Sequence, residues 1–285
     1  MNNIKQPKTL KSITRKIFYS LPVSLRYLLR KIIYLPHDLL SKRNPLVPPK
    51  GKIFIGSGDF LRIGNQFFQY FKKYGNITPD SAVLDVGCGI GRMAVPFTSF
   101  LSTNGKYEGF DIVKSGIDWC TKNITSRYSN FHFRLIPLQN DLYIDGKLEK
   151  AAHLKFPYDN KSFDFVFLTS VFTHMLEDDV MNYISEIHRV LKDDSICFTT
   201  FFILDEESES AMNTNGVKQF NFHYDHYSLM DNRVKEANVA YRKDFLFENL
   251  KKYNFEVLKF IRGNWSGLTT GELNEHQDIL ILKKL

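Results

Sequence analysis

The chain has 285 residues, a formal net charge of +7 and 25 phenylalanines, which allows one domain with a sizeable core, or one domain with an extension. Its cysteines, Cys88, Cys120 and Cys197, are widely spaced and include no C-x-x-C pair. This pattern argues against a disulfide framework, and we expect a reducing, cytoplasmic compartment.

The positive charge lies at the start of the chain. Residues 1–52 carry twelve Lys or Arg and one acid, Asp38, so the rest of the chain has a net charge of −4. Because a mildly acidic body suits nucleic acid poorly, we expect no nucleic-acid partner. Prolines at positions 45, 48 and 49 indicate a linker. We therefore predict two parts, a basic amphipathic extension over 1–52 and a body over 53–285.

The extension contains a predicted amphipathic helix. Apolar residues recur on one helical face, at Leu25, Leu28, Leu29, Ile32 and Ile33. Two interpretations stay open: this face packs on the body, or it lies on an anionic membrane surface at the inner face of the membrane, with contact through residues 1–45. A cleaved organelle presequence is a further interpretation, and only the positive charge of the extension supports it. No apolar run approaches the roughly 20 residues that span a bilayer, and arginines interrupt any signal peptide.

The body alternates predicted strands with predicted helices. After a first helix over 59–74, we expect strands at 82–86, 107–111, 131–136, 163–169 and 195–204. Helices are expected near 91–101, 115–127, 178–192 and 242–253, and a closing hairpin from 255–261 and 278–282. This order predicts an α/β fold with a parallel sheet and helices on both faces. A long insertion over 205–241 follows the fifth strand, and we expect a substrate lid there.

The first strand ends in a glycine-rich turn. Gly87, Gly89 and Gly91 stand at alternate positions, and Asp85 precedes the first of them by two. Glycines allow a ligand to approach the backbone, and the start of the next helix offers N–H groups. Asp111 ends the second strand, where a carboxylate suits the two hydroxyls of a ribose. These residues predict a nucleoside site.

The glycine spacing discriminates between ligands. Dinucleotide sites use G-x-G-x-x-G, whereas this chain has G-x-G-x-G beside Asp85. A carboxylate here would repel a pyrophosphate but would suit an ammonium or a sulfonium. An NAD(P)-dependent oxidoreductase is therefore the less favoured alternative. The pattern D-x-G-x-G-x-G resembles motif I of class I S-adenosylmethionine-dependent methyltransferases.

The resemblance continues over roughly residues 80–205. The segments that are similar to family motifs cover 107–112, 156–164, 168–175 and 184–192. The resemblance implies a Rossmann-like, seven-stranded, mostly parallel sheet with an antiparallel C-terminal strand, and S-adenosylmethionine as cofactor. It implies methyl transfer to an oxygen or nitrogen of a small molecule. Family members in surface-polysaccharide pathways look nearest, which implies a sugar of such a polysaccharide or a lipid-linked glycan as acceptor. A non-catalytic binding or regulatory protein of the same fold stays an alternative.

The resemblance also implies roles for single residues. The cofactor-binding set is Asp85, Gly87, Cys88, Gly89, Gly91, Asp111, Ile112, Thr169 and Ser170. Asp85 organises the turn and is expected to reach the ammonium group, and Asp111 accepts the ribose hydroxyls. Ile112 packs on the adenine, and Thr169 and Ser170 border the methyl group.

His174, beyond the fourth strand, is the candidate catalytic base, since an unperturbed histidine pKa of about 6.5 suits proton transfer near neutral pH. The alternative is a histidine that only hydrogen-bonds the backbone or the carboxylate of the donor.

One feature departs from the family pattern, and one candidate metal site has weak support. The acid that usually contacts adenine is missing after the third strand, and Asp141 is a displaced candidate. His223 and His226 lie in an aromatic run within the insertion, but they lack partners at ligand spacing, so we expect no metal site. The sequence does not predict an oligomeric state.

Overall fold

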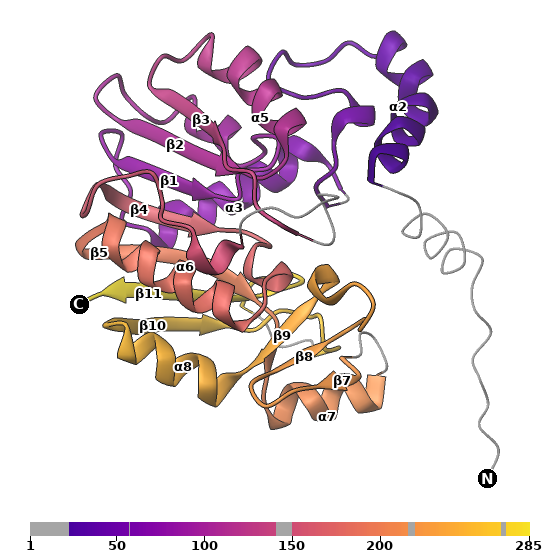
Figure 1. Cartoon of the computed structure of the whole chain (residues 1–285). Helices are drawn as coiled ribbons and strands as arrows, with labels where there is room; N and C mark the ends of the chain where they lie inside the picture. The colour runs from indigo at the N-terminus through magenta and orange to yellow at the C-terminus, as the bar shows by residue number, and fades with distance from the viewer. Residues whose placement is uncertain (1–22, 57, 141–149, 216–219, 269–271) are drawn as a thin grey trace, which may run out of the picture. The chain divides into compact units, whose positions relative to one another are not determined.

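The computed structural model describes residues 23–56, 58–140, 150–215, 220–268 and 272–285 (Figure 1). The chain divides into two compact units, Met1–Phe54 and Ile55–Leu285, and each is described by itself. In the part of the chain that the structure describes, no helix combines the length and apolarity needed to cross a membrane.

The N-terminal unit is built on helix α2, Val23–Leu40. The segment after it returns along the helix and forms a single turn, η1, Lys50–Lys52. The carboxylate of Asp38 accepts hydrogen bonds from the backbone N–H groups of Lys50, at 2.7 Å, and Gly51, at 2.9 Å. The rings of Tyr27 and Phe54 lie 6.0 Å apart. These contacts fix the segment against one face of α2.

The second unit begins with helix α3, Phe60–Tyr74, which confirms the helix expected over 59–74. The Asp59 side chain accepts a hydrogen bond from the Arg62 N–H at 2.7 Å and caps the helix start. The helix ends where Gly75 donates its N–H to the Phe71 carbonyl. The buried ring of Phe71 lies 4.4 Å from the ring of Phe167 in the central sheet.

The central sheet has seven strands in the order β10-β11-β5-β4-β1-β2-β3 (Figure 1). Their bounds are β1 Ala82–Val86, β2 Lys106–Asp111, β3 Phe131–Leu135, β4 Phe163–Leu168, β5 Leu191–Phe201, β10 Phe255–Ile261 and β11 Asp278–Lys284. Strands β1 to β5 pair in parallel, and β11 runs antiparallel to both of its neighbours. The predicted fold class, including the antiparallel C-terminal strand, is confirmed.

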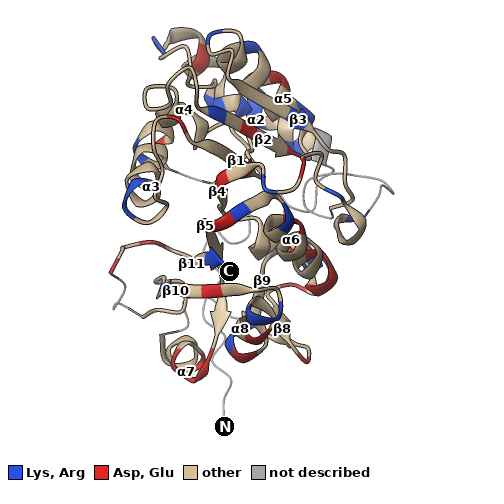
Figure 2. Cartoon of the chain, turned by 90° about the vertical axis from the view of Figure 1, so that its left-hand side faces the viewer, with Lys and Arg blue, Asp and Glu red and all other residues tan. Residues whose placement is uncertain are grey.

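Helices cover both faces of this sheet. Helix α3 lies on one face with α4, Ala94–Phe97, and α5, Lys114–Cys120. Helices α6, Glu177–Val190, and α8, Lys243–Lys252, lie on the other face (Figure 1). Charged residues of both signs are interspersed along these elements (Figure 2). The buried core between the layers is rich in phenylalanine.

Two predicted boundaries are wrong. A regular helix was expected over 91–101, but α4 covers only Ala94–Phe97 and has turns on both sides, and Pro96 has no N–H to bond back to the Arg92 carbonyl. The expected fifth strand, 195–204, combines two elements. Strand β5 ends at Phe201, and Ile203–Leu204 is β6 of a second sheet.

The second sheet has four short strands in the order β6-β9-β8-β7. The other elements around it are α7 Glu206–Asn215, β7 Phe222–His223, β8 Tyr227–Leu229, η5 Lys235–Ala237 and β9 Val239–Arg242. Buried Asp278, at the start of β11, ties the two sheets together. Its carboxylate accepts hydrogen bonds from the Ile203 N–H and the Trp265 indole, both at 2.7 Å. The expected insertion is therefore a folded subdomain rather than a loop.

Candidate active site

The glycine turn connects β1 to α4. All three glycines, Gly87, Gly89 and Gly91, have positive φ, at 76°, 58° and 80°. A Cβ at Gly87 would lie 2.4 Å from the Val171 side chain, and one at Gly89 would lie 2.8 Å from that of Ile55. Both the backbone conformation and the close approach therefore require glycine.

Asp111 ends β2 directly beside this turn. One carboxylate oxygen accepts the Gly89 N–H at 2.8 Å, and the other accepts the Val113 N–H at 2.7 Å. Burial raises the pKa of Asp111 to about 6, although the backbone N–H groups oppose this shift. The structure thus brings together the two parts of the predicted nucleoside site.

Asp85 lies beneath the turn. Its side chain is 1% exposed and accepts a hydrogen bond of 2.6 Å from the Tyr107 hydroxyl. Burial raises the pKa of Asp85 to about 8, the Tyr107 hydrogen bond opposes this, and the nearby Asp111 charge adds to it. Asp85 therefore supports the turn from below, and its contact with an ammonium group stays a prediction.

The backbone of the turn is fixed to the second strand. The N–H groups of Gly87 and Cys88 both donate to the Phe110 carbonyl, at 2.9 and 3.0 Å. The Cys88 thiol is buried, and burial raises its pKa well above the usual range. A thiol in this state is neutral and unreactive, so Cys88 contributes its backbone to the turn.

The adenine side of the site is only partly described. Ile112 is half-buried directly after Asp111, and its contact with adenine stays a prediction. Asp141, the displaced candidate for the adenine acid, lies outside the described residues.

The segment after β4 carries the other predicted residues. Thr169 is half-buried, and Ser170 is exposed with a φ of 59°, which is unusual for a residue other than glycine. The Ser170 N–H donates to the Thr200 hydroxyl at 2.8 Å, and its own hydroxyl donates to the Gln277 side-chain oxygen at 2.9 Å. Strained backbone of this kind concentrates at functional sites.

His174 ends a single helical turn, η4, Phe172–His174, after β4. Its Nδ1 lies 2.9 Å from the Glu236 carbonyl oxygen in η5. The next residue, Met175, accepts a hydrogen bond of 2.9 Å from the Tyr241 hydroxyl in β9. The insertion thus contacts the end of β4 at two points, and its role as a substrate lid stays a prediction.

Sequence reasoning missed a group of polar side chains at the same sheet edge. Gln277 also accepts from the Thr200 hydroxyl at 2.7 Å, and Glu275 accepts from the Tyr70 hydroxyl at 2.9 Å and from the Gln66 amide. The topology could have revealed Gln277. Because β11 is antiparallel, its start lies at the carboxyl ends of β4 and β5, where such sheets bind ligands.

The two candidate metal-binding histidines are engaged elsewhere. His223 Nδ1 lies 3.0 Å from the Ser228 hydroxyl. His226 lies 3.0 Å from the Glu177 carboxylate and stacks on Phe245 with ring centroids 4.0 Å apart. Across the described ranges, no three or more His, Cys, Asp or Glu side chains are grouped to hold a metal ion.

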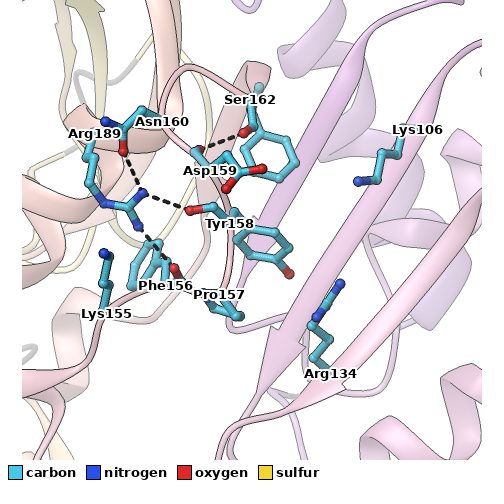
Figure 3. A pocket seen from close by; sticks show the side chains of 11 residues that line it. Lys106, Arg134, Lys155, Phe156, Pro157, Tyr158, Asp159, Asn160, Ser162 and Arg189 are labelled. Atoms are coloured by element: carbon cyan, nitrogen blue, oxygen red, sulfur yellow. Dashed lines mark hydrogen bonds between the residues drawn. The ribbon is translucent and has the colours of Figure 1, made fainter.

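A separate cleft of about 680 Å³ borders the segment before β4 (Figure 3). Arg189 lines it and donates to the carbonyl oxygens of Phe156, at 3.0 Å, and Tyr158, at 2.8 Å. Lys106 lies 2.9 Å from the buried Glu108 carboxylate. Two of the cations that line the cleft, Arg189 and Lys106, therefore bind groups of the protein itself. None of the predicted site residues lines this cleft, so we do not assign it to the active site.

Comparison with known proteins agrees with this geometry. Residues 84–199 match a family model described as a methyltransferase domain. A protein of Pyrococcus horikoshii OT3 has a TM-score of 0.56 and 15% identity, over 82% of this chain and 95% of its own. A SAM-dependent methyltransferase from Methanosarcina mazei has a TM-score of 0.51 and 20% identity, over 76% and 97%. The cyclase SpnF has a TM-score of 0.52 and 14% identity, over 81% and 84%. At these identities the structures show the fold.

The residues of the turn fit the nucleoside part of S-adenosylmethionine. The two Asp111 oxygens offer about four lone-pair positions, and the N–H groups of Gly89 and Val113 each bond one oxygen, so acceptor capacity remains for a ribose hydroxyl. The three glycines keep the approach to the backbone free of side chains. The matched segment begins in β1 and includes both the turn and Asp111. Residues 84–199 therefore form a methyltransferase domain, and the turn fits S-adenosylmethionine as the cofactor of this enzyme.

Proposed function

We propose that this enzyme methylates an oxygen, or a nitrogen, of a small-molecule acceptor, with His174 as the base. A sugar hydroxyl of a surface polysaccharide or a lipid-linked glycan is the acceptor that we favour. S-adenosylmethionine supplies a methyl group that its sulfonium already activates. The protein must therefore align the acceptor, exclude water and accept a proton.

The hydrogen bond between His174 and Glu236 is the observation that carries the proposal. A carbonyl oxygen only accepts, so Nδ1 of His174 must hold a proton to donate over the 2.9 Å. In the neutral ring, the basic lone pair is then on Nε2. The contact fixes both the tautomer and the direction of the ring, which is what a general base requires.

The polar side chains at the sheet edge support a hydroxylated acceptor. Ser170, Thr200 and Gln277 are joined by hydrogen bonds at the carboxyl ends of β4 and β5. Hydroxyl and amide groups both donate and accept, which matches the hydroxyls of a sugar. Phe222 in β7 and Tyr224 just after this strand are 41% and 40% exposed and offer aromatic rings.

Replacing His174 tests the assignment. Turnover of the His174→Ala variant, followed as release of S-adenosylhomocysteine with a panel of sugars and lipid-linked glycans, should fall by about 10²–10⁴-fold. The affinity for S-adenosylmethionine should stay within about twofold, because His174 acts on the acceptor. His153→Ala is a matched control, since His153 is exposed in η3, Ala151–His153.

The pH profile separates a base from a structural histidine. Loss of a base should remove the acidic limb of kcat/KM against pH, whereas loss of packing would lower turnover at every pH. Unchanged turnover of His174→Ala with an accepted substrate would exclude His174 as the base. Tight donor binding without release of S-adenosylhomocysteine from any acceptor would favour a binding protein.

A further inference from the structure

Helix α2 carries an unusual concentration of exposed apolar side chains. Among the described residues, twelve large apolar side chains are exposed, and seven of them lie on this one helix. These seven are Leu25, Leu28, Ile32, Ile33, Leu35, Leu39 and Leu40. Their exposure rises from 39% at Leu25 to 86% at Leu40. Such a contiguous apolar surface indicates a binding function.

The exposed apolar side chains and the residues that contact the returning segment lie on different faces of α2. Five of them, at positions 25, 28, 32, 35 and 39, follow steps of three and four residues and form one continuous stripe. Tyr27, Arg30 and Asp38 contact the segment that returns along the helix. At 100° per residue, these contact positions lie between about a quarter and a half of a turn from the middle of the stripe. The returning segment therefore leaves the apolar stripe open within its own unit.

Positive charges border the apolar surface. On a helical projection, Arg26 falls on one border of it and Lys31 on the other. Asp38 is the only acid in the helix, and it lies on the packed face. A helix that packs on a protein body usually keeps its charges on the opposite face, whereas a helix in a membrane interface has cations beside its apolar surface.

We propose that α2 binds in the plane of an anionic membrane surface. Its apolar side chains enter the boundary between headgroups and acyl chains, and Arg26 and Lys31 lie at the level of the lipid phosphates. A second copy of the helix fits less well, because a symmetric pair would bring the same cations close together. The placement does not depend on the methyl acceptor.

Co-sedimentation of the full-length protein with vesicles tests the proposal. The protein should sediment with vesicles of phosphatidylcholine mixed with phosphatidylglycerol. Binding should be weaker to phosphatidylcholine alone, and it should decrease as salt is added, because salt screens the charge attraction.

Matched variants assign the binding to the stripe. The Leu28→Glu/Ile32→Glu variant should lose sedimentation, whereas Leu258→Glu should keep it, because Leu258 has a similar exposure of 48% but lies on β10. Leu28→Ala/Ile32→Ala retains residues that favour a helix and should bind roughly tenfold more weakly per replaced residue. All variants should bind S-adenosylmethionine as the wild type does, which separates this proposal from the proposed function.

Several outcomes would overturn the proposal. Wild-type protein that stays in the supernatant with anionic vesicles would exclude it, as would full sedimentation of Leu28→Glu/Ile32→Glu. A wild-type dimer in solution that this variant converts to a monomer, without vesicle binding, would assign the stripe to self-association. A lower unfolding temperature of the variant, again without vesicle binding, would assign it to packing on the body.

Discussion

Asp111 combines two demands that oppose each other. It must be buried to lie beside the glycine turn, and burial raises its pKa to about 6. It must also accept hydrogen bonds from Gly89 and Val113 and still bind a ligand, which favours the ionised form. Burial and hydrogen bonding therefore shift the pKa of this carboxyl in opposite directions.

The affinity for S-adenosylmethionine should depend on this ionisation. If the carboxylate binds the ribose, the dissociation constant should rise by about tenfold per pH unit as the pH falls below about 6. Asp85, whose pKa is raised to about 8, stays mainly protonated between pH 5 and 7 and does not produce this change. Isothermal titration over that range measures the effect.

An asparagine at position 111 provides the comparison. Asp111→Asn should bind the donor weakly and with little dependence on pH, whereas Asp118→Asn, an exposed control in α5, should follow the wild type. A wild-type affinity that is constant from pH 5 to 7 would contradict the role given to Asp111.

The sequence was informative about single residues only where a motif exists. The spacing of Gly89 and Asp111 predicted that they meet, and they are joined by a hydrogen bond. Gln277 belongs to no motif. Its place at the carboxyl ends of β4 and β5 depends on the antiparallel direction of β11 and on contacts with residues more than 70 positions away. Such neighbours follow from topology and are not visible in local sequence.

Among the elements, α6 is joined to the segment before β4 by hydrogen bonds from an ion pair within the helix, Arg189 with Glu186. Arg189 donates to Glu186 at 2.6 Å and to the carbonyls of Phe156 and Tyr158. Glu186 accepts the Phe156 N–H at 2.7 Å in return. With 19% of its side chain exposed, Arg189 makes these bonds largely away from water, where unpaired groups are costly.

Removing this arginine should destabilise the fold strongly. Arg189→Ala leaves Glu186 and two carbonyl groups without their donor, so the free energy of unfolding should fall by about 2–4 kcal/mol. Urea unfolding measures the change. Arg127→Ala is the control, since Arg127 is exposed and donates only within its own helical segment, and it should change stability by about 0.5 kcal/mol or less. Equal stability of the two variants would exclude this stabilising role of Arg189.

Helices and strands could be predicted where the sequence has one clear apolar or turn pattern. The strand expected over 82–86 coincides with β1, since a short apolar run before a glycine turn has few alternatives. The helix expected over 91–101 was wrong, because the apolar pattern of this segment does not reveal the turns that flank the short α4. The second sheet escaped prediction because its strands have only two to four residues, too few to show a period.

At the scale of the whole molecule, the excess of positive charge and the predicted active-site residues lie in different parts of the chain. The N-terminal unit carries the excess of cations and the exposed apolar stripe, whereas the predicted site residues all lie in the second unit. This separation explains why the net charge of +7 is a poor guide to the ligand of the active site.

The central claim is that the glycine turn and Asp111 bind the nucleoside of S-adenosylmethionine. Calorimetric titration of the donor into full-length protein at pH 7.5, roughly 1.5 units above the pKa of Asp111, tests it most directly. We predict binding of one donor per chain, no heat with NADH, and an affinity about 100-fold lower for Asp111→Ala, as expected for loss of charge-assisted hydrogen bonds. No uptake of donor by folded protein, or equal affinity of Asp111→Ala, would contradict the account.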